Sequence, residues 1–203
     1  IKVTRVGLGT GMRGWMRQTN HTRMGPKRFD ALVAHCWDQG IRLFDVADLY
    51  GTHSHLARAL KGKPRDQYAL ISKVWVNPSG IPEPMEERPT ADGSVERFLK
   101  ELQTDTVDIV LLHCQTSADW PAIQKKHMEG LAKLKAKGVI KAHGVSCHTL
   151  AALEAAAAEP WVDVVLSRIN PYGAKMDGPP EKVAPVLKKA HDAGKAVIGM
   201  KII

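Results

Sequence analysis

Short apolar runs alternate along the chain with longer segments in which apolar residues recur every three or four positions. The apolar runs have the length of strands buried on both faces, and the longer segments fit amphipathic helices. The runs are VTRVGLGT (3–10), IRLFDVAD (41–48), YALISKVW (68–75), VDIVLLHC (107–114), KAHGVSC (141–147), VDVVLSRIN (162–170) and AVIGMKII (196–203). The helical segments lie at 29–40, 55–62, 95–103, 122–138, 152–158 and 182–194. This alternation predicts βαβ units and a parallel sheet covered by helices.

Glycines support the predicted helix ends. Gly40, Gly62, Gly138 and Gly194 each follow a helical segment closely, where a C-terminal capping glycine belongs. Parallel sheets of this kind form either a doubly wound sheet or a barrel. No GxGxxG motif opens a helix after the first strand, because GLGTGMRG has glycines at a different spacing.

Seven strands with one helix apiece favour a (β/α)8 TIM barrel. About seven βα units are visible, and the sequence stops inside the seventh strand at Ile203. We therefore expect one barrel domain over residues 1–203 whose C-terminal part is missing. The long connection at 77–93 holds four prolines and several acids, and it predicts a loop over one end of the sheet rather than a second domain.

Composition narrows the classes of function. The chain has 203 residues and a formal charge of +8, yet its Lys and Arg are scattered and form no basic tract interleaved with aromatics. We therefore expect no nucleic-acid partner. No apolar run is long enough to span a membrane. Cys36, Cys114 and Cys147 form no CxxC and indicate reduced thiols in the cytoplasm. Because the sequence begins at Ile1 rather than Met, a removed leader and export stay open.

Polar and reactive side chains gather where the predicted strands end. In parallel βα barrels the active site lies at the C-terminal ends of the strands, so we expect the chemistry among these side chains. They are Thr10, Asp45, Asp48, Tyr50, Lys73, His113, Ser146, His148, Asn170, Met200 and Lys201.

Asp45 and Lys73 are opposite charges in otherwise apolar neighbouring strands. Either alone would be costly to bury, and together they can neutralise each other. Tyr50 follows Asp45 closely, and a nearby ammonium group would lower the pKa of its phenol and make it a better proton donor. His113 would hydrogen-bond a substrate oxygen. The four residues together predict a site that protonates a carbonyl while hydride arrives from elsewhere.

Each residue also has a simpler interpretation. Asp45 and Lys73 could form a structural ion pair, His113 could be a core histidine, and Tyr50 could belong to a turn. A metal site built from His113, Cys114, Cys147 and His148 is disfavoured, because neighbours in a strand point to opposite faces and the spacing fits no compact zinc pattern. We expect no metal, and we expect Cys114 and Cys147 to pack outward against helices.

The strands carry motifs that resemble those of the aldo-keto reductase family. They are VGLGTG (6–11), FDVADLYG (44–51), LISKVW (70–75), VDIVLLH (107–113) and HGVSCH (143–148), in family order over nearly the whole sequence. The resemblance implies a nicotinamide-dependent (β/α)8 oxidoreductase that reduces aldehydes or ketones to alcohols. It also leaves open a regulatory subunit that binds the nucleotide without significant turnover.

The resemblance assigns the four catalytic roles. Tyr50 matches the general acid, Lys73 the residue that lowers its pKa, Asp45 the carboxylate paired with that lysine, and His113 the residue that orients the carbonyl. Trp15 and Trp75, with Tyr50 and His113, would line the substrate pocket. Trp120 could join them or pack a loop.

The resemblance also implies a set of residues that contact the cofactor. They are Gly9, Thr10, Asp45, Ser146, Asn170, Met200 and Lys201. Three positions depart from the common pattern: Cys147 where many members have Asn, Met200 where they have an aromatic, and Arg168 or Asn170 where the sixth strand usually brings a glutamine. We favour NADP(H) over NAD(H), although in the family the phosphate-binding segment lies beyond Ile203. The expected partner is a small carbonyl substrate; the oligomeric state is left open.

Overall fold

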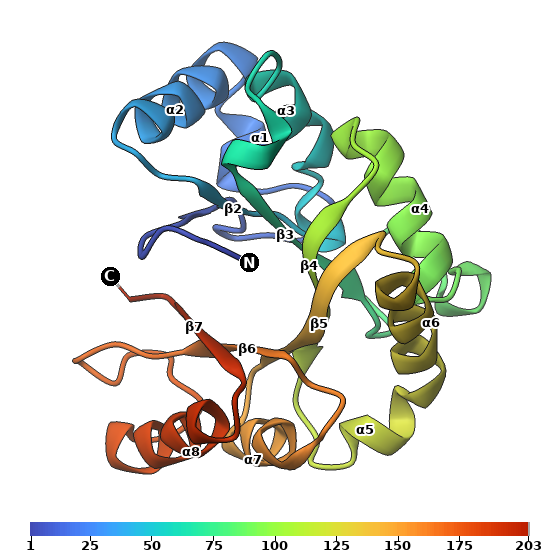
Figure 1. Ribbon diagram of the computed structural model, residues 1–203, viewed down its shortest axis with the longest axis vertical. Helices are drawn as coiled ribbons and strands as arrows, with labels where there is room; N and C mark the ends of the chain where they lie inside the picture. Colours follow the sequence, from blue (N-terminus) through green and yellow to red (C-terminus); the bar gives the residue numbers. More distant parts are fainter. Residues whose placement is uncertain (203) are drawn as a thin grey trace.

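The computed structural model describes residues 1–202. It contains one sheet of seven parallel strands that follow one another in chain order, and Figure 1 shows this sheet curled into an arc with the helices on its outside. The strands are β1 (Leu8–Gly9), β2 (Leu43–Asp45), β3 (Ala69–Trp75), β4 (Val107–Gln115), β5 (Ile140–Cys147), β6 (Val164–Arg168) and β7 (Ala196–Met200). The arrangement confirms the predicted barrel architecture, seen here as a curled half-barrel.

All six predicted helices are present, and their boundaries differ by a few residues. The segment at 122–138 is divided into two helices, and a short helix that the sequence pattern did not predict precedes Pro26. The α-helices are α1 (Asn20–Arg23), α2 (Pro26–Asp38), α3 (His53–Ala59), α4 (Ala91–Leu102), α5 (Trp120–Ile123), α6 (Lys125–Ala136), α7 (Leu150–Ala158) and α8 (Pro180–Asp192). Three single-turn 3₁₀ helices complete the set: η1 (Asp48–Tyr50), η2 (Arg65–Gln67) and η3 (Met85–Glu87). No helix within the described residues is long and apolar enough to cross a membrane.

The predicted capping glycines have the backbone that this role requires. Gly40, Gly62, Gly138 and Gly194 have φ angles of 82°, 81°, 73° and 82°, in the left-handed region that other residues adopt only with strain. The first strand is much shorter than predicted: only Leu8–Gly9 pairs with β2, whereas residues 3–6 form no ladder.

Two apolar layers pack against the two faces of the sheet. The larger one lies between the sheet and the surrounding helices and contains Phe44, Leu70 and Val110. The smaller one fills the inside of the arc with residues from the alternate strand positions, which are Leu43, Ala69, Ile71, Ile109, Leu111, Ala142, Val164 and Leu166. The apolar residues of these strands therefore follow period-two alternation between the inner and the outer layer.

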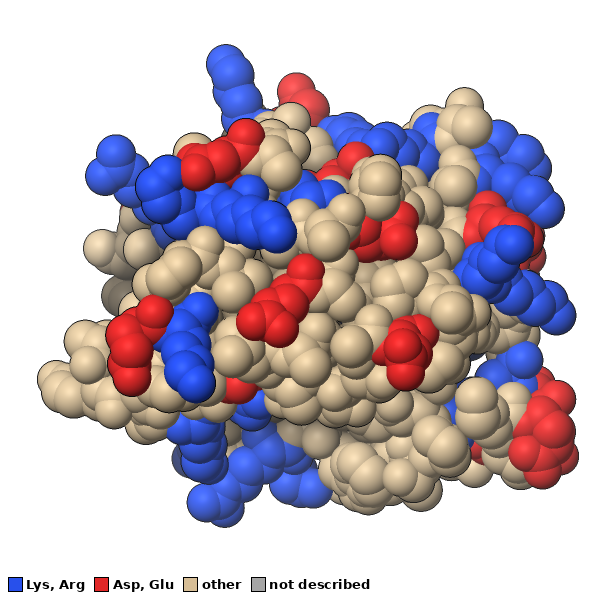
Figure 2. All heavy atoms as spheres, turned by 90° about the horizontal axis from the view of Figure 1, so that it is seen from below, with Lys and Arg blue, Asp and Glu red and all other residues tan. Residues whose placement is uncertain are grey.

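Basic side chains are spread over the surface. Figure 2 shows Lys and Arg around the edges of one face, with Asp and Glu between them. Several of these cations are paired with acids, as in Arg58–Asp30 and Lys135–Asp163.

Candidate active site

On the inner face of the sheet, apolar side chains give way to polar ones two residues further along the strand. Because side chains on the same face are two positions apart, the residue two positions beyond each inner apolar residue lies at the C-terminal mouth of the arc. Leu43 leads in this way to Asp45, Ile71 to Lys73, Leu111 to His113 and Gly144 to Ser146.

Lys73 is fully buried and paired with Asp45. The side chain of Lys73 is only 1% exposed, so water cannot solvate its charge. Its Nζ instead donates to the Asp45 carboxylate and, over 3.2 Å, to the backbone oxygen of Val46. Burial raises the pKa of Asp45, and the charge of Lys73 opposes that shift. The ion pair expected from the two strands is therefore present.

Tyr50 ends the η1 turn just beyond β2. Its Oη lies 3.4 Å from the His113 Nε2, and the Lys73 Nζ lies 4.9 Å from the centre of its ring. Burial, with a smaller contribution from the charge of Asp45, raises the pKa of Tyr50 well above 10. The net shift is therefore opposite to the lowered pKa expected from the sequence, because burial dominates and the charge of Asp45 adds to it.

His113 completes the group at the end of β4. Its ring packs edge to face against Trp75, with ring centres 5.1 Å apart, and against Tyr50 at 5.4 Å. Burial, and then the charge of Lys73, lowers the pKa of His113 well below 6.5, so the imidazole is neutral near pH 7. Its Nδ1 is buried and has no hydrogen-bond partner among the described residues.

Two glycines of the β1–α1 connection lie against the Tyr50 ring. A Cβ added at Gly11 would meet the Cζ of Tyr50 at 2.3 Å, and one at Gly14 would meet its Cδ1 at 2.8 Å. Only glycine allows the backbone to come this close to the phenol. The connection therefore covers one side of Tyr50.

The three tryptophans considered as pocket walls have different positions. Trp75 is 8% exposed and its Nε1 donates to the Ser79 backbone oxygen. Trp15 is 51% exposed and packs edge to face on Trp75 at 6.4 Å. Trp120 is buried between helices and donates to the Ala152 backbone oxygen, so it packs the core and lies away from the mouth.

The residues expected near a cofactor make several internal hydrogen bonds. Thr10 Oγ1 donates to the Asp45 backbone oxygen over 2.9 Å and lies 2.8 Å from Thr52 Oγ1. The Ser146 Oγ accepts the backbone N–H of Cys114 over 2.9 Å, which leaves the serine proton able to donate elsewhere. A Cβ at Gly9 would contact only the Asp45 carboxylate, at 3.9 Å.

The polar side chains at the end of β6 form hydrogen bonds with the loop that follows. The Asn170 Nδ2 donates to the Ala174 backbone oxygen, and its Oδ1 accepts the N–H groups of Tyr172 and Ala174. Arg168 pairs with the fully buried Asp177 and donates to the His148 backbone oxygen. Asn170 would have to give up its turn to reach a ligand.

Met200 and Lys201 lie beside this loop at the end of β7. Met200 pairs with Arg168 in the sheet register. Lys201 forms no ion pair with another residue in the described part of the chain, and burial, followed by the charge of Arg168, lowers its pKa. Lys201 is thus a cation at this end of the sheet that is available to an anionic ligand.

The donor set fits a nicotinamide dinucleotide. Such a cofactor needs hydrogen-bond partners for its carboxamide, a surface for its ring and positive charge for its phosphates. The Ser146 hydroxyl, the open space beside Gly9, the Met200 thioether and the Lys201 ammonium offer these features along the strand ends.

Cys114 lies beside His148 at the mouth, whereas the sequence predicted that Cys114 would pack outward against helices. Cys114 has a φ of 59°, and the β4–β5 register shifts between Leu112 and Gln115, so strict alternation fails there. The thiol lies 3.3 Å from the His148 Nε2. Burial raises the pKa of Cys114 to about 11 and lowers that of His148 to about 4, so both are neutral.

Cys147, by contrast, packs in the outer core as expected. Within residues 1–202, no group of three or more His, Cys, Asp or Glu side chains is arranged to hold a metal.

Asp48, which had no role in the sequence analysis, is buried behind Tyr50. Its carboxylate accepts from Arg17 and from Arg97, which lie in distant segments of the chain. The sequence alone does not indicate these ion pairs, because neither arginine is near Asp48 in the chain.

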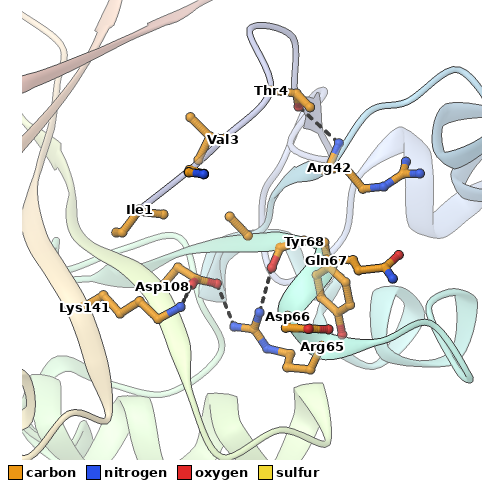
Figure 3. A pocket seen from close by; sticks show the side chains of 12 residues that line it. Ile1, Val3, Thr4, Arg42, Arg65, Asp66, Gln67, Tyr68, Asp108 and Lys141 are labelled. Atoms are coloured by element: carbon orange, nitrogen blue, oxygen red, sulfur yellow. Dashed lines mark hydrogen bonds and ion pairs between the residues drawn. The ribbon is translucent and has the colours of Figure 1, made fainter.

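A second hollow lies at the opposite end of the strands. It has a volume of about 360 Å³ and is bordered by the N-terminal segment, Arg65 and Tyr68 (Figure 3). Asp108 at its edge is held by Arg65 and Lys141, each over 2.6 Å. Tyr50, His113 and Lys73 do not line this hollow.

Comparison with known proteins identifies the family. The sequence profile of the aldo/keto reductase family matches residues 5–203, and the chain belongs to this family. The chain is 26% identical over 150 residues to methylglyoxal reductase DkgB of Salmonella typhi, covering 70% of this chain and 52% of that protein. It is 32% identical over 146 residues to 6-dehydroglucose reductase of Agrobacterium fabrum, covering 66% and 48%. The chain thus spans about half the length of these curated relatives.

Solved structures agree with this assignment. A structure from Pseudomonas aeruginosa that bears the designation aldo-keto reductase superposes with a TM-score of 0.76 at 28% identity, covering 98% of this chain and 73% of that one. An aldo/keto reductase from Klebsiella pneumoniae, solved in complex with NADP and acetate, gives 0.56 at 26% identity, covering 82% and 55%.

Proposed function

We propose that the protein reduces aldehydes or ketones to alcohols with NAD(P)H. One observation carries the proposal: the Tyr50 hydroxyl and the His113 Nε2 converge to 3.4 Å beside the buried Lys73–Asp45 pair, at the strand ends where a barrel enzyme has its active site. Membership of the aldo/keto reductase family and relatives named as reductases of carbonyl compounds support it.

The proposed reaction divides the work between cofactor and protein. The bound nicotinamide would supply hydride to the carbonyl carbon. The neutral His113 imidazole orients the carbonyl oxygen, and Tyr50 donates its proton to that oxygen as negative charge develops there. Lys73, close to the phenol ring, stabilises the phenolate that remains, while Asp45 keeps the buried lysine in place.

The raised pKa of Tyr50 has two consequences: the phenol is protonated at neutral pH, and in the protein alone it is a weaker acid than an ordinary tyrosine. A phenol that holds its proton well above pH 10 is always loaded as an acid at neutral pH. The proton leaves only when the developing alkoxide, a much stronger base than water, is within reach.

For the cofactor, we propose contacts with Gly9, Thr10, Ser146, Met200 and Lys201, with NADP(H) favoured over NAD(H). The available charge of Lys201 and the NADP in the Klebsiella pneumoniae structure support this preference. Trp15 and Trp75 would form the apolar wall of the substrate pocket. The three cysteines are free thiols, which suits a cytoplasmic location.

The Tyr50→Phe variant tests the proposal. We expect the rate of NADPH oxidation with a panel of small aldehydes and ketones to fall by about 100-fold or more, because the proton donor is removed. NADPH binding, followed by tryptophan fluorescence, should not change. Tyr172→Phe is the matched control, since Tyr172 is 88% exposed on a loop.

Two results would count against the proposal. Turnover by Tyr50→Phe at the parent rate would remove Tyr50 as the acid. A parent protein that binds NADPH and oxidises it with no carbonyl would instead favour a regulatory nucleotide-binding role.

A further inference from the structure

Asp48 is a buried carboxylate at the first position of the turn that carries Tyr50. It is 3% exposed, and its Oδ1 accepts from the Arg17 Nε over 2.9 Å and from the Arg97 NH2 over 2.8 Å. Neither arginine contributes to the proposed chemistry. Burying the Asp48 carboxylate costs desolvation energy, and the two charge-assisted hydrogen bonds from the arginines offset this cost.

The two arginines tie the turn to separate parts of the molecule. Arg17 belongs to the connection that covers Tyr50, and its NH1 also reaches Glu83 in the β3–α4 loop over 2.6 Å. The Arg17 backbone presses on the end of the turn, since a Cβ at Gly51 would lie 2.1 Å from the Arg17 oxygen. Asp48 therefore joins the η1 turn to two loops at the mouth.

Arg97 continues the network behind the sheet. It pairs with Glu101 in α4 over 2.7 Å, and Glu101 lies 2.7 Å from the Nδ1 of the buried His53. The His53 Nε2 lies 2.8 Å from the Ser72 Oγ, next to Lys73 in β3. The chain of contacts thus runs from the turn that carries the phenol to the strand that carries the lysine.

Beyond the packing of Leu49 and Tyr50, few hydrogen bonds hold the η1 turn. It is three residues long, has no side-chain cap, and is closed by the bonds from Tyr50 N to Ala47 O and from Gly51 N to Asp48 O. We propose that Asp48 is a positioning residue: held by Arg17 and Arg97, it fixes the Asp48–Tyr50 turn so that the phenol faces His113 and Lys73. This inference rests on the proposed carbonyl reduction and adds to it a residue that touches no reacting atom.

Asp108 provides a matched control at the other end of the strands. It is also a buried aspartate held by two basic side chains, Arg65 and Lys141, and it is equally far from solvent (Figure 3). Asp48→Asn and Asp108→Asn remove the same charge from the same kind of site. The difference that the experiment uses is the position relative to Tyr50, since Asp108 lies at the opposite ends of the strands.

The experiment compares steady-state reduction and amide hydrogen exchange in the parent, Asp48→Asn and Asp108→Asn. We expect Asp48→Asn to lose about 10-fold or more in kcat with KM within about threefold, because a small displacement of the acid slows proton transfer more than binding. Exchange of the amides at 48–54 should quicken in Asp48→Asn alone. Asp108→Asn should keep kcat within about twofold. Parent-like kcat in Asp48→Asn, or an equal loss in Asp108→Asn, overturns the inference.

A second pair of variants keeps the test decisive if Asp48→Asn does not fold. Arg17→Gln should lower kcat, and Arg17→Lys should restore most of it, because lysine can still pair with Asp48 although it cannot also reach Glu83. Equal, parent-like kcat in both variants would contradict the inference. If the parent reduces no carbonyl, the proposed function fails, whereas the exchange at 48–54 still reports whether Asp48 holds the turn.

Discussion

Tyr50 and His113 have pKa values shifted in opposite directions by the same burial. Burial disfavours the charged form of each group, so the phenol stays protonated and the imidazole stays neutral. Lys73 adds to the shift of His113 by repelling a second positive charge. The pair is thus a protonated phenol beside a neutral imidazole, the charge states that the proposed carbonyl reduction uses.

The two shifts predict a flat pH profile. Because the pKa of His113 lies well below 6.5 and that of Tyr50 well above 10, neither group titrates between about pH 6 and about pH 9. We expect kcat/KM for carbonyl reduction at saturating NADPH to vary by less than about threefold over this range. The opposite result would be a loss of kcat/KM at low pH with its midpoint near the ordinary histidine pKa. If this loss were absent from His113→Asn, the His113 imidazole would be the group that becomes charged.

The positions of three residues that we propose as catalytic could be predicted because they follow strand periodicity. Asp45, Lys73 and His113 each continue an inner apolar row by two positions, and the sequence alone displays those rows. Cys114 could not be placed, because its positive φ interrupts the alternation. The pKa of Tyr50 was predicted in the wrong direction, because the depth of its burial depends on loops whose packing the sequence pattern does not specify.

Strands and helices were predictable where their apolar pattern is long. β3, β4 and β5 agree with the predicted runs within a residue or so, whereas β1 has only two residues, since pairing with β2 begins at Leu8. The predicted helix at 122–138 is interrupted at Gln124, whose backbone ends α5 and precedes α6. Contacts between side chains of loops and helices were not predictable, as the Arg97–Asp48 pair shows, whereas the Asp45–Lys73 pair between neighbouring strands was.

The His53–Glu101 contact between α3 and α4 predicts an acid-sensitive stability. Burial alone would raise the pKa of Glu101, but hydrogen bonds from His53 and Arg97 lower it to about 2 from 4.5. A depressed carboxyl pKa stabilises the fold above the unfolded value of 4.5, and this stabilisation disappears as pH falls from about 4.5 towards about 2. Allowing for the partial exposure of Glu101, we expect about 2 kcal/mol at neutral pH.

Glu101→Gln should therefore melt about 4–8 °C below the parent at pH 7, and the gap should narrow steadily as the pH is lowered from about 4.5 to about 3. Thermal unfolding followed by circular dichroism at several pH values measures this gap. Glu154→Gln, at an exposed position of α7, is the control and should track the parent throughout. A gap of constant size down to pH 3 would mean that Glu101 stabilises the fold through packing rather than through its charge.

The two ends of the curled sheet carry different kinds of buried charge. At the C-terminal ends, Lys73 and Asp48 lie under loops and next to Tyr50. At the N-terminal ends, Asp108 joins Arg65 to Lys141 and accepts the Leu70 backbone N–H. In barrels of this class the first end serves chemistry and the second serves stability. Substitutions of similar chemical type should therefore affect activity at one end and folding at the other.

Between these ends, β5 and β6 approach each other closely at one glycine in β5. Gly144 occupies an inner position between Ala142 and Ser146, and a Cβ there would lie 1.9 Å from the Val164 backbone oxygen of β6. Because the obstacle is backbone in a paired strand, it cannot rotate away as a side chain could, and β5 and β6 would have to separate.

We expect Gly144→Ala to destabilise the protein by about 3 kcal/mol, which corresponds to a fall of about 6–12 °C in Tm. Gly178→Ala is the control, since a Cβ there meets its nearest neighbours at 3.6 Å, an ordinary contact. Differential scanning calorimetry of both variants measures the effect. If the two variants melt together, β5 and β6 can accommodate the methyl group.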